Sequence, residues 1–310
     1  MPTGLLILRP KPTGLLRQGC FSSRYATACL LGNASYSIVF AVALSPTTAF
    51  ATVSDVKCSR VRTHPLLRLA EVAEDQWGLV TRQQAQAARV PRATFERLVA
   101  ATSLERIDTG VYRIAGAPVP DHVELRAAWL HLAPGLQRWQ RTIEQGVVSH
   151  RSAASLYGAG DLPADRHEFT VPMRRQSRKP GVRFHIRREG PGRWIEMSGL
   201  PVTRPSQIAA DLLLDNEDPG AVAQIIATSL EKVYDYPGTF ARSLAPSAAR
   251  FGLRRHDGLA LLAWLLDLVS HDNTGRWLQE ARDSLAHRGS SRDPDPGGWE
   301  EPRSAVGDHR

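Results

Sequence analysis

Residues 89–101, RVPRATFERLVAA, decide how the surrounding chain folds. Phe95 and Leu98 have the three-residue spacing that places apolar side chains on one face of an α-helix. Pro91 suits the first turn of that helix, because the backbone N–H that proline lacks would have no intrahelical partner there. The opposite face carries Arg97 between two alanines. Such a helix either packs into a core as an ordinary element or also presents a cation to a groove of DNA.

The segment before this helix predicts two more helices and a short strand. Helical spacing of apolar residues indicates a helix over 64–76, and an apolar piece over 78–80 is long enough only for an edge strand. Thr81 and Gln84 form a capping-box pattern, in which each side chain accepts a hydrogen bond from a free backbone N–H. A second helix is therefore expected over residues 82–88.

Two β-prone runs follow, LERID at 104–108 and VYRIA at 111–115. Thr109 and Gly110 between them are typical of a tight hairpin turn. The order helix, short strand, helix, tight turn, helix and hairpin predicts a winged helix-turn-helix DNA-binding domain over residues 63–117. In such domains the helix after the turn enters the major groove, and the hairpin lies along the phosphate backbone.

The predicted outer face of this domain supplies candidate contacts to DNA. We expect Arg92 and Arg97 to donate hydrogen bonds to guanine O6 and N7, and Thr94 to reach a phosphate or a base edge. The hairpin residues expected to contact phosphates are Arg106, Thr109, Tyr112 and Arg113. Residues 81–115 carry six arginines against three acidic residues, which is a modest excess of positive charge for a DNA-binding domain. The alternative is a protein-interaction domain whose arginines form a solvated face.

The whole chain has 310 residues and a formal charge of +8, with a pI of about 9.8. This length suits two domains with additional ends, and the charge favours an anionic partner. Cys20, Cys29 and Cys58 all lie near the N-terminus, so the body of the protein is expected to be free of disulfides and cytoplasmic. No spacing of His and Cys predicts a zinc site, and no metal or cofactor is expected.

The two ends differ in composition from the rest of the chain. No Asp or Glu precedes residue 55, and the apolar run SIVFAVAL is followed by an Ala-Phe-Ala motif, the pattern of a secretory signal peptide. The run is too short to span a membrane. Two alternatives to a signal peptide remain for residues 1–62: a disordered extension, or upstream sequence translated from a start codon that was assigned too early. Residues 288–310 are rich in Gly, Pro, Asp and Ser, which predicts a disordered tail.

Residues 118–287 predict a mixed α+β domain. Strands are expected at 167–171 and 182–186, with a third apolar piece over 194–202. From Pro205 onward the apolar periodicity is helical. The chain as a whole is therefore assigned to the α+β class, with an N-terminal winged helix, then a small sheet and a helical C-terminal part.

A basic segment lies within this second domain. Residues 166–193 contain nine Arg or Lys residues against two Glu. The members of the candidate second basic surface are Arg174, Arg175, Arg178, Lys179, Arg183, Arg187 and Arg188. Such a surface would suit nucleic acid or an acidic protein partner. Alternatively, these cations belong to a solvated hairpin, where they discourage pairing at a sheet edge.

The stretch GLVTRQQAQAARVPRATFERLVAATSLERIDTGVYRIAGAP resembles the N-terminal domain of AbiEi-type antitoxins of type IV toxin–antitoxin systems. SHRSAASLYG and GLPVTRPSQIAADLL are similar to the C-terminal domain of the same group. The resemblance implies a winged helix that binds inverted repeats in double-stranded promoter DNA and represses its own operon. It also implies that the C-terminal domain counteracts a nucleotidyltransferase-like toxin, directly or indirectly. At the turn between the second and third helices this sequence has Arg89, whereas glycine would adopt the turn conformation with least strain.

Two other functions remain open. A plain winged-helix transcriptional regulator would bind DNA without affecting a toxin. A Vsr-like DNA endonuclease can carry a similar front half, but it needs carboxylates and a lysine on adjacent strands. The acids after Pro205, such as Asp211 and Asp215, fall on predicted helices or loops. Ser149 and His150 are expected to cap and pack a helix rather than to catalyse, so no catalytic residue is predicted.

Overall fold

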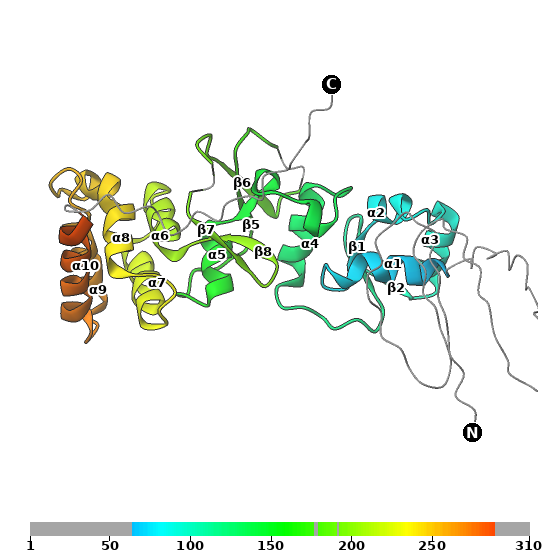
Figure 1. Ribbon diagram of the computed structural model, residues 1–310, viewed down its shortest axis with the longest axis horizontal. Coiled ribbons are helices and arrows are strands. Elements are labelled where there is room, and N and C mark those ends of the chain that lie inside the picture. The colour runs from blue at the N-terminus through cyan, green and yellow to red at the C-terminus, as the bar shows by residue number, and fades with distance from the viewer. Residues whose placement is uncertain (1–63, 177–178, 191, 289–310) are drawn as a thin grey trace, which may run out of the picture. The chain divides into compact units, whose positions relative to one another are not determined.

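The computed structural model describes residues 64–176, 179–190 and 192–288 (Figure 1). Its helices and two sheets confirm the predicted α+β class. The predicted signal peptide or extension lies outside the described residues, as does the predicted tail from residue 289 onward. Among the described residues, no helix combines the length and apolar character needed to cross a membrane.

The N-terminal part contains a three-stranded antiparallel sheet of order β1-β3-β2. In chain order its elements are α1 (Pro65–Glu74), β1 (Leu79–Thr81), α2 (Arg82–Ala87), α3 (Arg92–Ala100), β2 (Leu104–Asp108) and β3 (Val111–Ile114). The elements follow the order expected from the sequence. A capping box starts α2, because the Gln84 N–H donates to Thr81 Oγ1 at 3.1 Å and the Thr81 N–H donates to Gln84 Oε1 at 2.9 Å.

The turn between α2 and α3 is supported by α1. Arg89 occupies the turn with φ of 56°, in the left-handed region that glycine adopts without strain. Arg68 Nη1 donates to the carbonyl oxygens of Ala88 and Arg89, at 3.2 and 3.0 Å, and so satisfies backbone acceptors at the end of α2. Phe95 anchors α3 by packing edge-on against Tyr112, with ring centroids 4.9 Å apart.

The C-terminal part combines a five-stranded mixed sheet with a group of helices. The strands are β4 (Val147–Val148), β5 (His167–Val171), β6 (Val182–Ile186), β7 (Trp194–Met197) and β8 (Leu200–Thr203). They lie in the order β6-β5-β4-β8-β7, in which β5 with β6 and β4 with β8 are parallel pairs. The third apolar piece, expected over 194–202, folds as the antiparallel pair β7 and β8.

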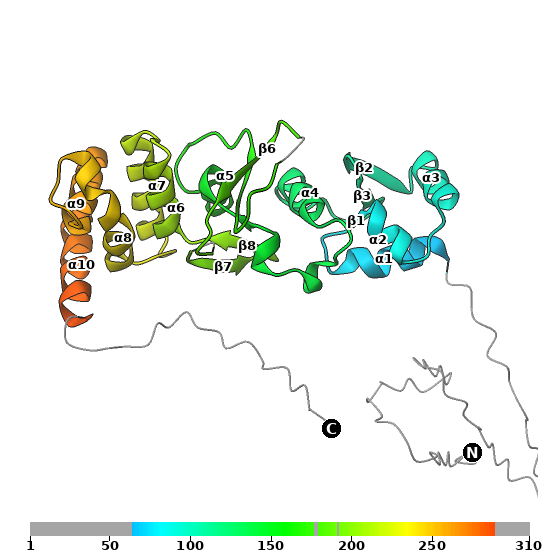
Figure 2. The same ribbon diagram turned by 90° about the horizontal axis from the view of Figure 1, so that it is seen from above.

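The helices of the C-terminal part precede, interrupt and follow its sheet in the sequence. The α-helices are α4 (Val123–Leu132), α5 (His150–Tyr157), α6 (Pro205–Leu214), α7 (Pro219–Glu231), α8 (Pro237–Leu244), α9 (Gly258–Val269) and α10 (Thr274–Arg288). Short 3-10 helices are η1 (Arg138–Gln140), η2 (Ile143–Gln145) and η3 (Ala245–Phe251). α5 packs on β5, and α8, α9 and α10 lie side by side (Figure 2). Phe169 of β5, Ile225 of α7 and Phe240 of α8 are buried in one core, which these helices share with the sheet.

The described residues form two hydrophobic clusters, one within the N-terminal part and a larger one that extends across the N-terminal and C-terminal parts. Leu79 of β1 is buried in the same cluster as Trp129 of α4. Trp77 Nε1 donates to the Ser198 carbonyl at 3.0 Å, which adds a polar contact between the two parts. The domain boundary predicted after residue 117 therefore falls between elements that share a core, and the boundary itself stays a prediction.

Candidate nucleic-acid interface

One face of α3 is turned to solvent. Phe95 is 2% exposed, whereas Arg92, Ala93 and Arg97 have exposed side chains. Arg97 lies along its own helix, and its Nη2 donates to Thr94 Oγ1 at 3.1 Å. The buried and exposed positions follow the two helical faces expected from the sequence. The solvent face opposite Phe95 therefore carries Arg97, while Arg92 is exposed at the start of the helix.

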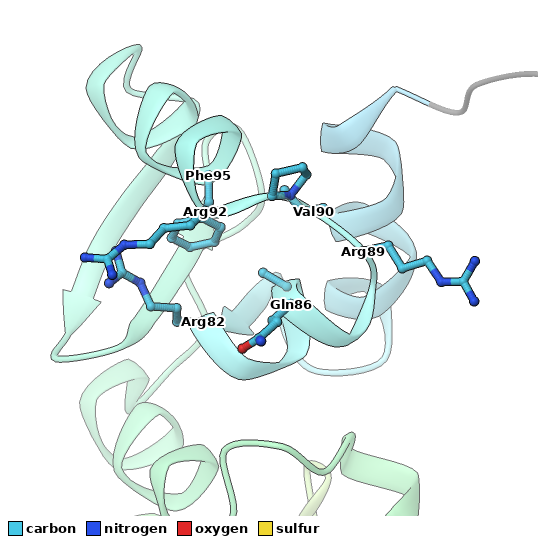
Figure 3. A pocket seen from close by; sticks show the side chains of 8 residues that line it. Arg82, Gln86, Arg89, Val90, Arg92 and Phe95 are labelled. Carbon is cyan, nitrogen blue, oxygen red and sulfur yellow. The ribbon is translucent and has the colours of Figure 1, made fainter.

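Two arginines from different helices converge on Glu96. Arg82, at the start of α2, forms an ion pair with Glu96 through its Nη2, and Arg92 Nε lies 3.8 Å from the same carboxylate oxygen. The Arg82 guanidinium also lies 5.7 Å from the centroid of the Phe95 ring. Figure 3 shows the two guanidinium groups close together. The starts of α2 and α3 thus present a shared pair of cations, which suits contact with a DNA phosphate.

A cleft of about 600 Å³ lies between α2 and α3. Its lining residues are Arg82, Ala85, Gln86, Arg89, Val90, Pro91, Arg92 and Phe95. Arg89 extends away from Arg82 and Arg92, on the other side of the cleft (Figure 3). Arg82 and Gln86 are not among the contacts predicted from the sequence. Their four-residue spacing, which places them on one face of α2, is the signal that could identify them.

The four hairpin residues predicted to contact DNA differ in their exposure to solvent. Arg106 and Thr109 are exposed, and Arg106 Nη2 donates to Thr109 Oγ1 at 3.3 Å. Tyr112 is 7% exposed and belongs to the core of the N-terminal part. Arg113 has a 12% exposed side chain that is ion-paired with Glu105. The structure thus gives Tyr112 a packing role and Arg113 a pairing role, so Arg106 and Thr109 are the accessible residues among the four predicted hairpin contacts.

Acids from other segments neutralise part of the predicted second basic surface. The ion pairs are Lys179–Asp108, Arg183–Asp215 and Arg187–Asp211. Arg175 donates to the carbonyl oxygen of Leu132. Arg174 and Arg188 have exposed side chains, and Arg178 lies outside the described residues. The positive charge that this segment offers to a partner is therefore smaller than its own sequence suggests.

Residues 67–115 match the family model described as "Transcriptional regulator, AbiEi antitoxin". The match runs from within α1 to just beyond β3, and it includes both helices that border the cleft. The resemblance of this segment to AbiEi-type antitoxins is therefore confirmed. No curated protein matches the chain.

Proposed function

We propose that this chain is a DNA-binding antitoxin that represses transcription of its own operon. The observation that carries the proposal is the exposed arginine face of α3, within a segment that matches a family of transcriptional regulators. Arg97 belongs to that face and Arg92 is exposed at the start of the helix, while Phe95 packs in the core. A helix anchored in this way can enter the major groove without losing its packing.

In this proposal, base contacts from α3 are combined with phosphate contacts beside it. Arg97 donates to guanine O6 and N7, Arg92 shares a phosphate with Arg82, and Thr94 contacts a phosphate or a base edge. Arg106 and Thr109 of the hairpin position the chain on the phosphate backbone. The target is an inverted repeat in cytoplasmic promoter DNA. A chain bound there represses transcription because it blocks the polymerase sterically.

A reporter assay tests the repression. The promoter upstream of the chain's own gene drives the reporter, and the full chain is supplied from an independent promoter. We expect the chain to lower the reporter signal and the Arg97→Ala variant to restore most of it. An unrelated promoter, which the chain should leave unchanged, serves as the control. A signal that does not respond to the wild-type chain would contradict the proposal.

The antitoxin activity is supported by the family match of residues 67–115 and by the resemblance of the α5 and α6 segments to the antitoxin domain. The proposed target is a nucleotidyltransferase-like toxin, which the chain binds directly or opposes indirectly. The test is co-expression with a nucleotidyltransferase that is encoded beside this chain. Growth that the nucleotidyltransferase arrests should resume when the chain is present. Continued arrest despite reporter repression would identify a plain transcriptional regulator instead.

A further inference from the structure

Side chains from separate elements meet beside β6, an edge strand of the five-stranded sheet. His150 begins α5, His185 lies on β6, and Asp215 follows the last residue of α6. The two imidazole rings stack, with centroids 3.4 Å apart and planes inclined by 12°. One nitrogen of each ring and one Asp215 carboxylate oxygen lie within 4.8 Å of one another. Imidazole nitrogens and carboxylate oxygens are common ligands of first-row metal ions.

The surroundings of His185 favour a cation between these groups. Its Nε2 lies 3.3 Å from Glu168 Oε1, and its Nδ1 lies 3.5 Å from Asp215 Oδ2. A neutral imidazole carries one N–H, so it can donate to only one of the two carboxylates. If Nε2 donates to Glu168, the lone pair of Nδ1 faces an oxygen of Asp215. A metal ion relieves this contact, because it accepts an electron pair from each of the two atoms.

A buried carboxylate lies behind His185. Glu168 Oε2 accepts a hydrogen bond from the Arg151 N–H at 2.9 Å, which fixes the position of this carboxylate. Its Oε1 faces His185 Nε2 and can orient that ring, as carboxylates commonly orient metal-binding histidines.

We propose that His150, His185 and Asp215 bind a divalent transition-metal ion, of which Zn²⁺ is the reference case. Arg183 now supplies a positive charge there, with its Nη2 3.1 Å from Asp215 Oδ2. Its side chain is 49% exposed and can move aside into solvent. The His150 ring turns out of the stack on binding, because the nitrogen lone pairs of two parallel rings cannot converge on one ion. Water takes the remaining coordination position.

An ion in this position would join the start of α5, the strand β6 and the end of α6. The folded chain brings these three elements together, whereas the unfolded chain does not. Binding therefore stabilises the folded chain. We expect the unfolding temperature of the metal-free chain to rise when Zn²⁺ is added.

The test is a titration of Zn²⁺ and Co²⁺ into full chain that carries no polyhistidine tag and has been treated with a chelator. Cys20, Cys29 and Cys58, which lie outside the described residues, are changed to Ser in every sample because thiolates also bind Zn²⁺. We expect one Zn²⁺ per chain by calorimetry and intense visible Co²⁺ bands. His185→Ala and Asp215→Asn should each weaken binding by roughly tenfold or more.

The matched control is His256→Asn, which removes an exposed histidine and should bind Zn²⁺ as the parent does. Asp215→Asn keeps a polar residue of similar size after α6 and is expected to fold. If His185→Ala does not fold, Zn²⁺ binding by Asp215→Asn tests the proposed site. A parent that binds no Zn²⁺ would overturn the proposal and leave the cluster as an ion-pair network alone. Binding that is as tight in Asp215→Asn as in the parent would overturn it as well.

Discussion

Arg82 at the start of α2 is ion-paired with Glu96 on α3, across the turn that positions the exposed face of α3. Glu96 also lies 3.8 Å from Arg92. One carboxylate therefore offsets the charge of two arginines beside the cleft. A DNA phosphate would compete with Glu96 for these cations, so the carboxylate limits how strongly the cleft attracts DNA of any sequence.

Replacing Glu96 by Gln should strengthen non-specific DNA binding, because both arginines lose a carboxylate partner. We expect the affinity for unrelated duplex DNA to rise roughly three- to tenfold at low salt, with a steeper dependence on salt. Fluorescence anisotropy of a labelled duplex measures both quantities. Glu280→Gln on α10, which also lies four residues after an arginine partner, is the control. Equal affinity in Glu96→Gln and wild type would mean that the two arginines do not face phosphates.

Replacing Arg97 by Ala should remove sequence preference. The change deletes a predicted donor to guanine, and we expect it to cost about 1–3 kcal/mol of discrimination between operator and unrelated DNA. Competition binding with the two DNA types measures this difference. Arg276→Ala removes an exposed arginine of α10 and should leave the discrimination intact. An Arg97→Ala chain that is as selective as wild type would contradict the assignment of α3 to the groove.

Two residues with left-handed backbone should respond in opposite directions to substitution. Arg89 has φ of 56° and an exposed side chain, so Arg89→Gly relieves strain and should raise the free energy of unfolding by about 0.5–1 kcal/mol. Gly110 has φ of 79°, and an added Cβ would meet no atom within 4 Å. Gly110→Ala should therefore lower the free energy of unfolding by about 1–2 kcal/mol through the backbone alone.

Urea unfolding measures both substitutions. The comparison is internal, since one change removes a Cβ from a left-handed residue and the other adds one. A lower free energy of unfolding in Arg89→Gly would mean that the Arg89 side chain contributes more than the relief of strain.

The free energy of unfolding should fall as the pH is lowered from 6.5. Burial lowers the pKa of His150 from 6.5 to about 3, so the unfolded chain binds a proton in this range that the folded chain excludes. The loss from this group is at most about 1.4 kcal/mol per pH unit, and it is absent well above pH 6.5. The lowered pKa of Glu168 adds a loss of the same sign below its ordinary value of 4.5.

His150→Asn isolates the histidine contribution, because Asn tolerates the positive φ of 53° at this residue. Chemical unfolding between pH 6.5 and 4.5, with a chelator present, should show a shallower decline in this variant than in wild type. His256→Asn, an exposed histidine with φ of 62°, should decline as wild type does. Equal slopes for His150→Asn and wild type would contradict the effect of burial on His150.

The local pattern of the sequence predicts α3 well, because the spacing of Phe95 and Leu98 determines which side of the helix packs. It does not show that Tyr112 packs in the core, because a β-strand residue near a turn can face either the core or solvent. The side that it takes depends on the ring of Phe95, which belongs to another element. Arg82 and Gln86 become candidate site residues only when α2 and α3 are seen to enclose one cleft.

Charge and ligand clusters are harder to predict than helices, since they depend on distant segments. The count of cations over 166–193 omits Asp108, Asp211 and Asp215, which pair with members of that segment in the folded chain. The cluster of His150, His185 and Asp215 is not predicted from the sequence for the same reason. His150 and His185 lie on separate elements, so no short spacing motif marks them.

The most direct test of the DNA-binding proposal is a mobility shift of the full chain on the DNA upstream of its own gene. The assay is run at two salt concentrations, with unlabelled operator or unrelated duplex as competitor. We predict a discrete shift that operator DNA competes away, that unrelated DNA leaves in place, and that weakens as salt rises. Absence of a shift, or equal competition by both duplexes, would contradict the proposal that α3 reads promoter DNA.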